Sequence, residues 1–319
     1  MTKSAQIQFL RSGLITSLQG EPINNLQHQG ITTSGPMDYF LSKIGNIVLD
    51  NNKEDISFEI CKFGPKINIL EGSFIFLISG NINFKIISNS EIITGECFKS
   101  YILNKGDILD VNETINSNYA YLVFKGKLDD KNFNNYSSTI LSASIGLNKG
   151  EKTDDLDQFT ILDVPNFNNR KVNININDYY DKKIRVLKGP QMNFFKITDI
   201  KKFFTKKFKI SKNLNRVGIR LIDNLIKPLI SSNIPSEGVI KGTIQVPGDG
   251  NPIVLAAEHP TIGGYPKIAT IIIADFVKMI QLEEGSNLNF EEVDILNAER
   301  EYLAFKNKIE NIKNNIVYL

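Results

Sequence analysis

The sequence predicts a mainly β protein with a minor share of helix, divided into two domains. Short runs rich in β-branched and aromatic residues recur along the chain, each bounded by Gly, Asn, Asp or Pro, as strands of an antiparallel sheet or barrel are. Helical periodicity is confined to a few segments. At 319 residues the chain also exceeds the usual size of a single hydrophobic core.

The predicted strands are short. The segment Asp55–Phe63 shows the alternation of a strand, with Phe58 on one face and Glu59 on the other. Further strands are predicted at Ile67–Leu70, Phe74–Ile78, Ile82–Ile87, Tyr101–Leu103, Tyr119–Phe124, Lys183–Leu187 and Ile240–Val246.

Helices are predicted at Met37–Val48, Lys267–Gln281 and from Val293 to about Ile312, with a short one near Asp199–Phe204. Before the first helix, Ser34-Gly35-Pro36 offers a capping residue and a proline for the first turn. The polar, Asn-rich stretch 148–183 marks a change of composition. It places the boundary between an N-terminal domain, residues 1–165, and a C-terminal domain, residues 166–319.

Composition excludes several classes of protein. A net charge of +2 gives no reason to expect a nucleic-acid partner. The two cysteines and two histidines have no metal-ligand spacing, so no metal is expected. The N-terminus lacks the apolar region of a signal peptide, and no apolar run approaches the ~18 residues that span a bilayer. We therefore expect a cytoplasmic protein with no membrane partner.

The segment Gly242–Pro266 has the order of elements that builds a pocket. Pro247-Gly248-Asp249-Gly250 predicts a hairpin turn, because Asp-Gly tolerates positive φ. The returning strand is continuously apolar and ends at Glu258, where a buried carboxylate must be paired, hydrated or functional.

The loop that follows contains Gly263-Gly264, whose lack of side chains allows a ligand to approach the backbone. Pro266 fits the first turn of the predicted helix, whose free N–H groups would favour an anion. The alternative is a simple tight turn, with Glu258 acting as a helix cap or an ion-pair partner.

Arg216 and Arg220 form a second candidate. If their segment is a strand, both side chains point to one face with only Gly218 between them, an arrangement that favours an anion or carboxylate. The alternative is an exposed edge strand that pairs with acidic neighbours.

Other polar residues are explained more simply. Capping accounts for Ser34, and the helix dipole accounts for Asp38, whereas Glu59 lies in an otherwise apolar strand. His28 and His259 belong to no motif and are interpreted as structural or solvated. The sequence contains no G-x-S-x-G, P-loop or G-x-G-x-x-G motif, so ATP would have to bind without them or through a partner chain.

The motifs of Gly242–Pro266 resemble the family called allophanate hydrolase subunit 2, or biotin-dependent carboxyltransferase domain. The matching residues include Gln245, Pro252, Thr261, Gly263, Gly264, Tyr265 and Pro266. Asn215–Leu221 is similar to the family's Asn/Asp-Arg-Met-Gly-Tyr-Arg-Leu, and Ser34, Asp38 and Glu59 match its N-terminal motifs. The similarity covers nearly the whole chain, but Gly20–Ile23 lacks the family's Asp-x-Gly-Arg.

The resemblance implies two cyclophilin-like β-barrel domains in tandem and a place in a heteromeric complex. It favours the C-type component of an ATP-dependent 5-oxoprolinase, inactive alone, with a B-type (subunit-1-like) partner and, as a further candidate, an A-type partner. That hydrolase converts 5-oxoproline and ATP to glutamate, ADP and phosphate. One alternative is the carboxyltransferase component of a biotin-dependent urea or amide carboxylase, with biotin carried by another protein. The other is a non-catalytic regulator of a subunit-1-like protein, which the lost Asp-x-Gly-Arg favours.

Under the favoured interpretation, the residues expected to be catalytic are Glu258, Arg216 and Arg220. Glu258 would be a polar organiser or acid/base group, while the two arginines and the glycine loop would hold an anionic substrate group or phosphate. The residues expected to bind substrate are Gln245, Thr261, Gly263, Gly264, Tyr265, Ser34, Asp38 and Glu59.

Overall fold

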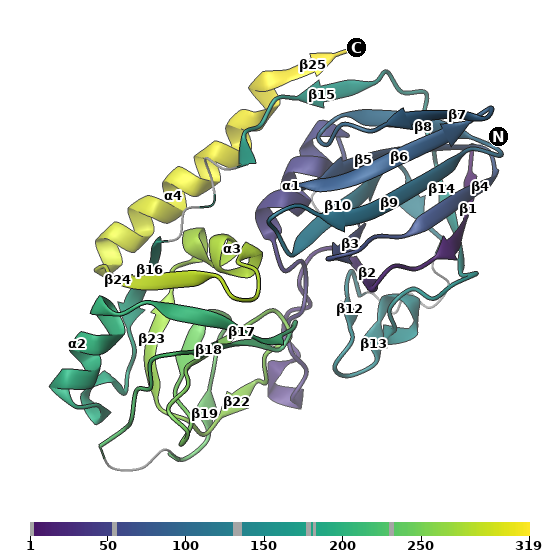
Figure 1. The fold of residues 1–319 in the computed structure, drawn as a ribbon. Coiled ribbons are helices and arrows are strands. Elements are labelled where there is room, and N and C mark those ends of the chain that lie inside the picture. The colour runs from purple at the N-terminus through teal and green to yellow at the C-terminus, as the bar shows by residue number, and fades with distance from the viewer. Residues whose placement is uncertain (1–2, 53–55, 130–135, 177–179, 181–182, 230–232) are drawn as a thin grey trace. The chain divides into compact units, whose positions relative to one another are not determined.

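A computed structural model describes residues 3–52, 56–129, 136–176, 180, 183–229 and 233–319 (Figure 1). The chain forms two compact units, both discontinuous in sequence. The first unit contains Met1–Ile23, Asp38–Ile176 and Lys308–Leu319, and the second contains Asn24–Met37 and Asn177–Asn307. Strands dominate both units, which confirms the prediction of a mainly β protein with two β units. The domain division between residues 165 and 166 stays a prediction.

The described residues of the first unit form two large sheets and two small ones. The seven-stranded sheet has the order β11 (Lys127–Leu128), β14 (Gln158–Leu162), β1 (Ala5–Arg11), β4 (Lys66–Glu71), β9 (Ile108–Thr114), β6 (Ile82–Ser88) and β7 (Glu91–Thr94). The five-stranded sheet has the order β2 (Ile15–Gln19), β3 (Ser57–Cys61), β10 (Tyr119–Phe124), β5 (Ser73–Ser79) and β8 (Ser100–Asn104). The small pairs are β12 (Thr139–Ile140) with β13 (Ile145–Gly146), and β15 (Arg170–Val172) with β25 (Ile316–Tyr318).

Aromatic side chains join the two large sheets of the first unit. Phe9 of β1 and Phe58 of β3 are fully buried, and their ring centroids lie 5.2 Å apart. Phe58 also contacts Phe124 of β10 at 5.6 Å. Their burial supplies much of the apolar area that holds the sheets together. Asp55, the first residue of the predicted strand that contains Phe58, lies outside the described residues.

Helix α1 (Tyr39–Val48) packs on β5 and β10 of the first unit. Its N-cap is Asp38, whose carboxylate accepts a hydrogen bond from the Leu41 N–H at 3.0 Å. Ser34 and Pro36 lie outside the helix, so the predictions of a serine cap and an N1 proline are wrong. A Cβ at Gly45 would overlap the Val123 side chain, so this glycine allows the helix to approach β10 closely.

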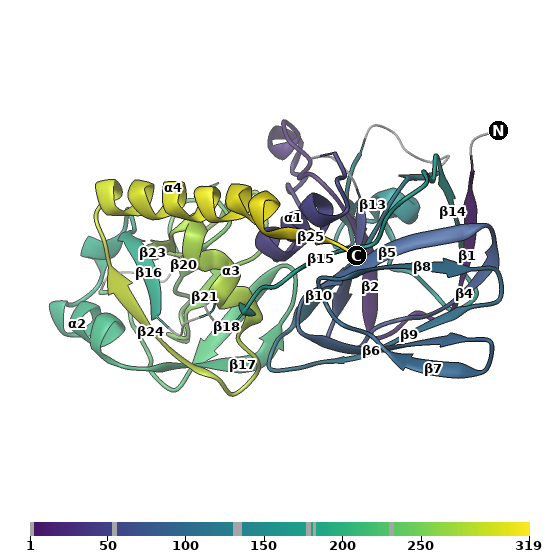
Figure 2. The same cartoon turned by 90° about the horizontal axis from the view of Figure 1, so that it is seen from above.

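The second unit contains a closed barrel (Figures 1 and 2). Its strand order is β16 (Lys183–Lys188), β23 (Lys267–Ile271), β20 (Thr243–Gln245), β21 (Ile253–Leu255), β18 (Gly218–Ile222), β17 (Phe208–Leu214) and β24 (Asn287–Glu292). A short pair, β19 (Glu237–Gly238) with β22 (Ile262–Gly263), accompanies the barrel. The pairings are antiparallel except that of β16 with β24.

Three helices complete the described elements of eight residues or more: α2 (Ile197–Thr205), α3 (Ile273–Gln281) and α4 (Ile295–Asn311). The predictions of helices near residues 199–204 and 293–312 are confirmed. The prediction of one helix over 267–281 is wrong at its start, because residues 267–271 form β23. That segment is rich in β-branched residues, and its backbone pairs with both β16 and β20 in the barrel.

Candidate functional site

Barrel pairing brings Arg216 and Glu258 together within the second unit. Strand β18 pairs antiparallel with β21, with Gly218 opposite Leu255. The residues just before β18 and just after β21 also lie side by side, since the Glu258 N–H donates to the Arg216 carbonyl at 2.7 Å. The two charged side chains, 42 positions apart in sequence, therefore start from adjacent backbone.

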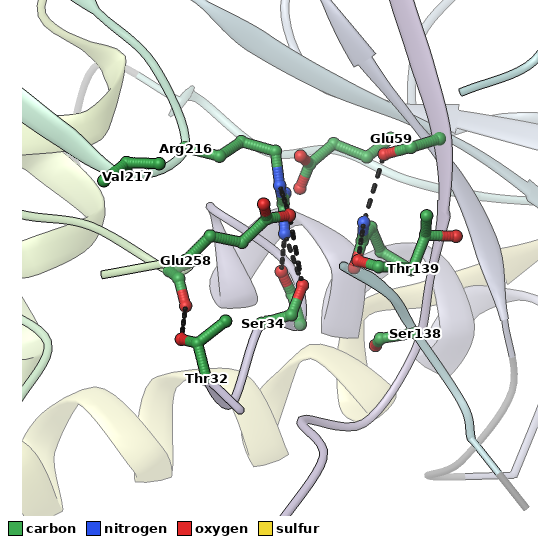
Figure 3. Close-up of polar contacts among 12 residues, drawn as sticks. Thr32, Ser34, Glu59, Ser138, Thr139, Arg216, Val217 and Glu258 are labelled. Carbon is green, nitrogen blue, oxygen red and sulfur yellow. Dashed lines mark hydrogen bonds and ion pairs between the residues drawn. The ribbon is translucent and has the colours of Figure 1, made fainter. Parts of the chain in front are cut away.

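The Arg216 guanidinium donates hydrogen bonds to acceptors of the second unit (Figure 3). Its Nε donates to Glu258 Oε1 at 2.6 Å, and its Nη2 donates to Ser34 Oγ at 2.9 Å and to the Gly35 carbonyl at 2.8 Å. The Ser34 hydroxyl lies 3.4 Å from Glu258 Oε1. Arg216, Glu258 and Ser34 are 7%, 3% and 1% exposed. We call these three residues the arginine cluster.

The backbone that presents Ser34 to the arginine cluster is unusual. Ser34 has φ +50° and Gly35 has φ +86°, so two successive residues occupy the left-handed region. A serine rarely adopts this conformation, and the surrounding contacts must stabilise it. Nearby, the Thr32 hydroxyl donates to the Ala257 carbonyl at 3.3 Å, which ties this segment to the residue before Glu258 (Figure 3). The capping interpretation of Ser34 is therefore wrong, and the serine belongs to the arginine cluster.

Arg220 is not part of the arginine cluster. It lies within β18 and forms a partly exposed ion pair with Asp249 of the β20–β21 turn. Arg216 precedes the first residue of that strand, so the prediction that both arginines share one strand face is wrong. The turn itself is confirmed, because the Gly250 N–H donates to the Pro247 carbonyl at 2.9 Å.

The predicted glycine loop lines a pocket of the second unit with a volume of about 480 Å³. Gln245, Gly263, Gly264 and Tyr265 are among its lining residues. Thr261 lies outside the lining residues, and its carbonyl accepts a hydrogen bond from the Val239 N–H at 3.2 Å. The loop leads into strand β23, so the predicted anion site at a helix N-terminus after Pro266 is wrong.

Asp38 and Glu59 belong to a different polar group, in the first unit. The Tyr121 hydroxyl donates to Glu59 Oε2 at 2.7 Å and accepts a hydrogen bond from the Asp38 N–H at 2.8 Å. Burial raises the pKa of Tyr121 well above its usual value, and the charges of Glu59 and Asp38 raise it further. The phenol therefore remains protonated and donates to the carboxylate.

Tyr121 is a polar residue that sequence reasoning missed, because it stands inside the continuously apolar run of β10. Its only signal is a hydroxyl in a strand that is buried along its whole length, since such a group needs a partner.

His259 is buried beside Glu258, in agreement with a structural role. Its Nδ1 lies 2.7 Å from the Pro260 carbonyl, where it acts as the donor in the neutral ring. Burial lowers the pKa of His259, outweighing the opposing effect of the carbonyl hydrogen bond. The described residues contain no cluster of three or more His, Cys, Asp or Glu side chains able to hold a metal ion. Among the helices of the described chain, none is long and apolar enough to cross a membrane.

The chain combines two β units, one of which contains a closed barrel, with a buried arginine–carboxylate pair. A family model described as "Carboxyltransferase domain, subdomain A and B" matches residues 29–292. The chain therefore belongs to this carboxyltransferase-domain family, as the sequence motifs indicated.

Two relatives match along nearly their whole length. The chain is 25% identical over 284 residues to the C subunit of 5-oxoprolinase from Escherichia coli, covering 89% of this chain and 90% of the relative. It is 27% identical over 285 residues to the C subunit of 5-oxoprolinase from Haemophilus influenzae, covering 89% of each.

A solved structure supports the same fold. The crystal structure of the Kluyveromyces lactis urea amidolyase is similar with a TM-score of 0.86 at 24% identity. The similarity covers 99% of this chain but only 21% of the urea amidolyase chain. The chain thus spans about a fifth of that larger protein.

Proposed function

We propose that this chain is the C-type component of an ATP-dependent amide or lactam hydrolase complex of the 5-oxoprolinase type. The observation that carries the proposal is the similarity to the C subunits of two 5-oxoprolinases, which the chain matches over about nine tenths of both sequences. In this proposal the complex is cytoplasmic, and ATP is bound together with a B-type partner. An A-type protein is the further partner.

Within the complex, Glu258 is our candidate acid/base residue. Its carboxylate is buried and fixed by the Arg216 guanidinium, which supports a single orientation toward a reacting group. Because Arg216 donates to Glu258, Ser34 and Gly35, we assign it as a positioning residue rather than as the group that receives a substrate anion. Arg220 would have to leave Asp249 before it could contact a substrate.

The test is co-purification of the tagged chain with its partners, followed by an assay of glutamate release from 5-oxoproline with and without ATP. We expect ATP-dependent turnover by the complex and none by the isolated chain. A complex that assembles but releases no glutamate would contradict the proposal.

A Glu258→Gln variant tests the acid/base assignment in that assembled complex. We expect its turnover to fall about 10²- to 10⁴-fold, the usual contribution of a positioned acid/base group. The matched control is Glu292→Gln, which makes the same change in an exposed ion pair with Lys188. Equal activity of the two variants would refute the assignment.

A second candidate function is carboxyl transfer, favoured by the family's description and by the fold of the urea amidolyase structure. In that case biotin would arrive on a partner protein. Co-purification of a biotinylated protein, with ATP- and bicarbonate-dependent carboxylation of urea, would favour this function over lactam hydrolysis.

A further inference from the structure

We propose that helix α4 carries a self-complementary surface through which two copies of this chain associate, with their α4 helices antiparallel. Two features of the helix support this proposal, and both belong to its part in the second unit. One is a row of large apolar side chains that are exposed to solvent. The other is a pair of opposite charges on the same face, Glu299 and Lys306, whose order along the helix matches that of an antiparallel copy.

The outer face of α4 is apolar where the solvated face of a surface helix is usually polar. Its large apolar residues are Ile295, Leu296, Tyr302 and Leu303, which are 65%, 66%, 43% and 56% exposed. They form two layers seven residues apart, so all four lie on one side of the helix, two turns from each other. Single apolar residues are ordinary on a protein surface, whereas a contiguous row of large ones marks an interaction surface.

The inner face of α4 holds the helix against the barrel. Glu301 forms an ion pair with Arg185 of β16 at 2.5 Å. The Arg185 guanidinium also donates two hydrogen bonds of 2.7 Å to Asp275 of α3, which is fully buried. Figures 1 and 2 show α4 (yellow) on the outside of the second unit, beside β16. The exposed row therefore lies on a fixed element, which reduces the entropy that association costs.

The charges on the outer face indicate which partner fits. Glu299 and Lys306 are exposed and lie on the same side of the helix as the apolar row. In an antiparallel pair centred between Tyr302 and Leu303, Glu299 of one copy lies level with Lys306 of the other, and the contact occurs twice. The apolar residues at the centre meet their own counterparts, as in any interface with two-fold symmetry. A parallel pair would instead place Glu299 against Glu299, which is unfavourable.

The proposed surface lies outside the part of the chain that the family model matches. That match ends at residue 292, and α4 begins at Ile295. One helix pair covers less than the roughly 800 Å² per partner of a standard interface, so we expect a reversible dimer that forms at micromolar concentrations or above. Association of two copies needs neither ATP nor another protein, so it is independent of the proposed function.

Sedimentation velocity of the full chain, over about a hundredfold range of protein concentration, tests the association. We expect the mass to rise from one chain to two. Leu303→Asp places a carboxylate at the centre of the pair and should keep the chain monomeric. The matched control is Ile197→Asp, the same kind of change on α2 at a residue that is 84% exposed, and this variant should dimerise as the natural chain does. A natural chain that stays monomeric, or equal weakening by the two variants, would overturn the proposal.

Charge exchange tests the antiparallel arrangement. Glu299→Lys places two lysines level with each other, and Lys306→Glu places two glutamates level, so each variant should weaken association about tenfold. A mixture of the two variants should associate as the natural chain does, because every lysine then faces a glutamate of the other copy. The double variant should also recover. A mixture that associates no better than either variant alone would refute the antiparallel pairing.

Two further measurements separate a self-association surface from other roles. The changed residues are exposed, so the thermal midpoint of each variant at low concentration should stay close to that of the natural chain. A large fall would mean that the face is structural and would contradict the proposal. A natural chain that is monomeric by itself, but whose co-purification with a subunit-1-like protein is lost in Leu303→Asp, would assign the face to that protein and overturn self-association.

Discussion

The arginine cluster and the glycine-loop pocket lie in the same unit but differ in whether their buried polar groups are hydrogen-bonded. The Arg216 guanidinium meets a carboxylate, a hydroxyl and a carbonyl, so its charge is compensated. Gln245 is a lining residue of the pocket, but its Nε2 is fully buried and has no hydrogen-bond partner among the described residues. A satisfied buried group fixes local geometry, whereas an unsatisfied one lowers the stability of the folded state.

Breaking the arginine cluster should give the largest loss of stability. Arg216→Met leaves the buried Glu258 carboxylate without its counter-ion, and we expect the free energy of unfolding to fall by about 3–5 kcal/mol. Urea denaturation measures this change. The double variant Arg216→Met with Glu258→Leu should recover most of the loss, because both charges of the pair are then removed. A single variant as stable as the natural chain would show that the pair is hydrated.

Protonation of His259 should produce a smaller, pH-dependent effect. Burial lowers its pKa in the folded state below the ordinary value of 6.5. Between the two pKa values the unfolded chain binds more protons, so stability is present above pH 6.5 and is lost as the pH falls toward the folded pKa. Denaturation between about pH 7.5 and pH 5 should show this loss, and His259→Gln should reduce its slope. An identical slope in both proteins would assign the loss to other groups.

Removing the other arginine of the motif should have the smallest effect. Arg220 and Asp249 are both accessible to solvent, and exposed ion pairs contribute only about 0–1 kcal/mol. Arg220→Ala should therefore lower the free energy of unfolding by less than about 1 kcal/mol in the same urea experiment. A loss as large as that of Arg216→Met would remove the contrast between the two arginines.

Local patterns predicted most of the fold. The alternation around Phe58 and the apolar run of β10 indicated strands, and the Asp-Gly turn after Pro247 indicated a hairpin. These features depend on neighbouring residues, which a sequence displays directly. The prediction that a helix begins at Lys267 is wrong. A short apolar run fits the periodicity of a strand as well as that of a helix, and pairing within the barrel makes this segment a strand.

The sequence by itself determined the mainly β class and the family, and it predicted Glu258 and Gly263 as site residues. Only the tertiary structure showed that Ser34 meets Arg216, 182 positions away, and that Gly263 makes room for the Gln245 amide. The physical reason is that a residue's type limits the bonds it can form. Which partner it meets, and whether a buried donor is left without one, depends on barrel closure and on loops that bring distant segments into contact.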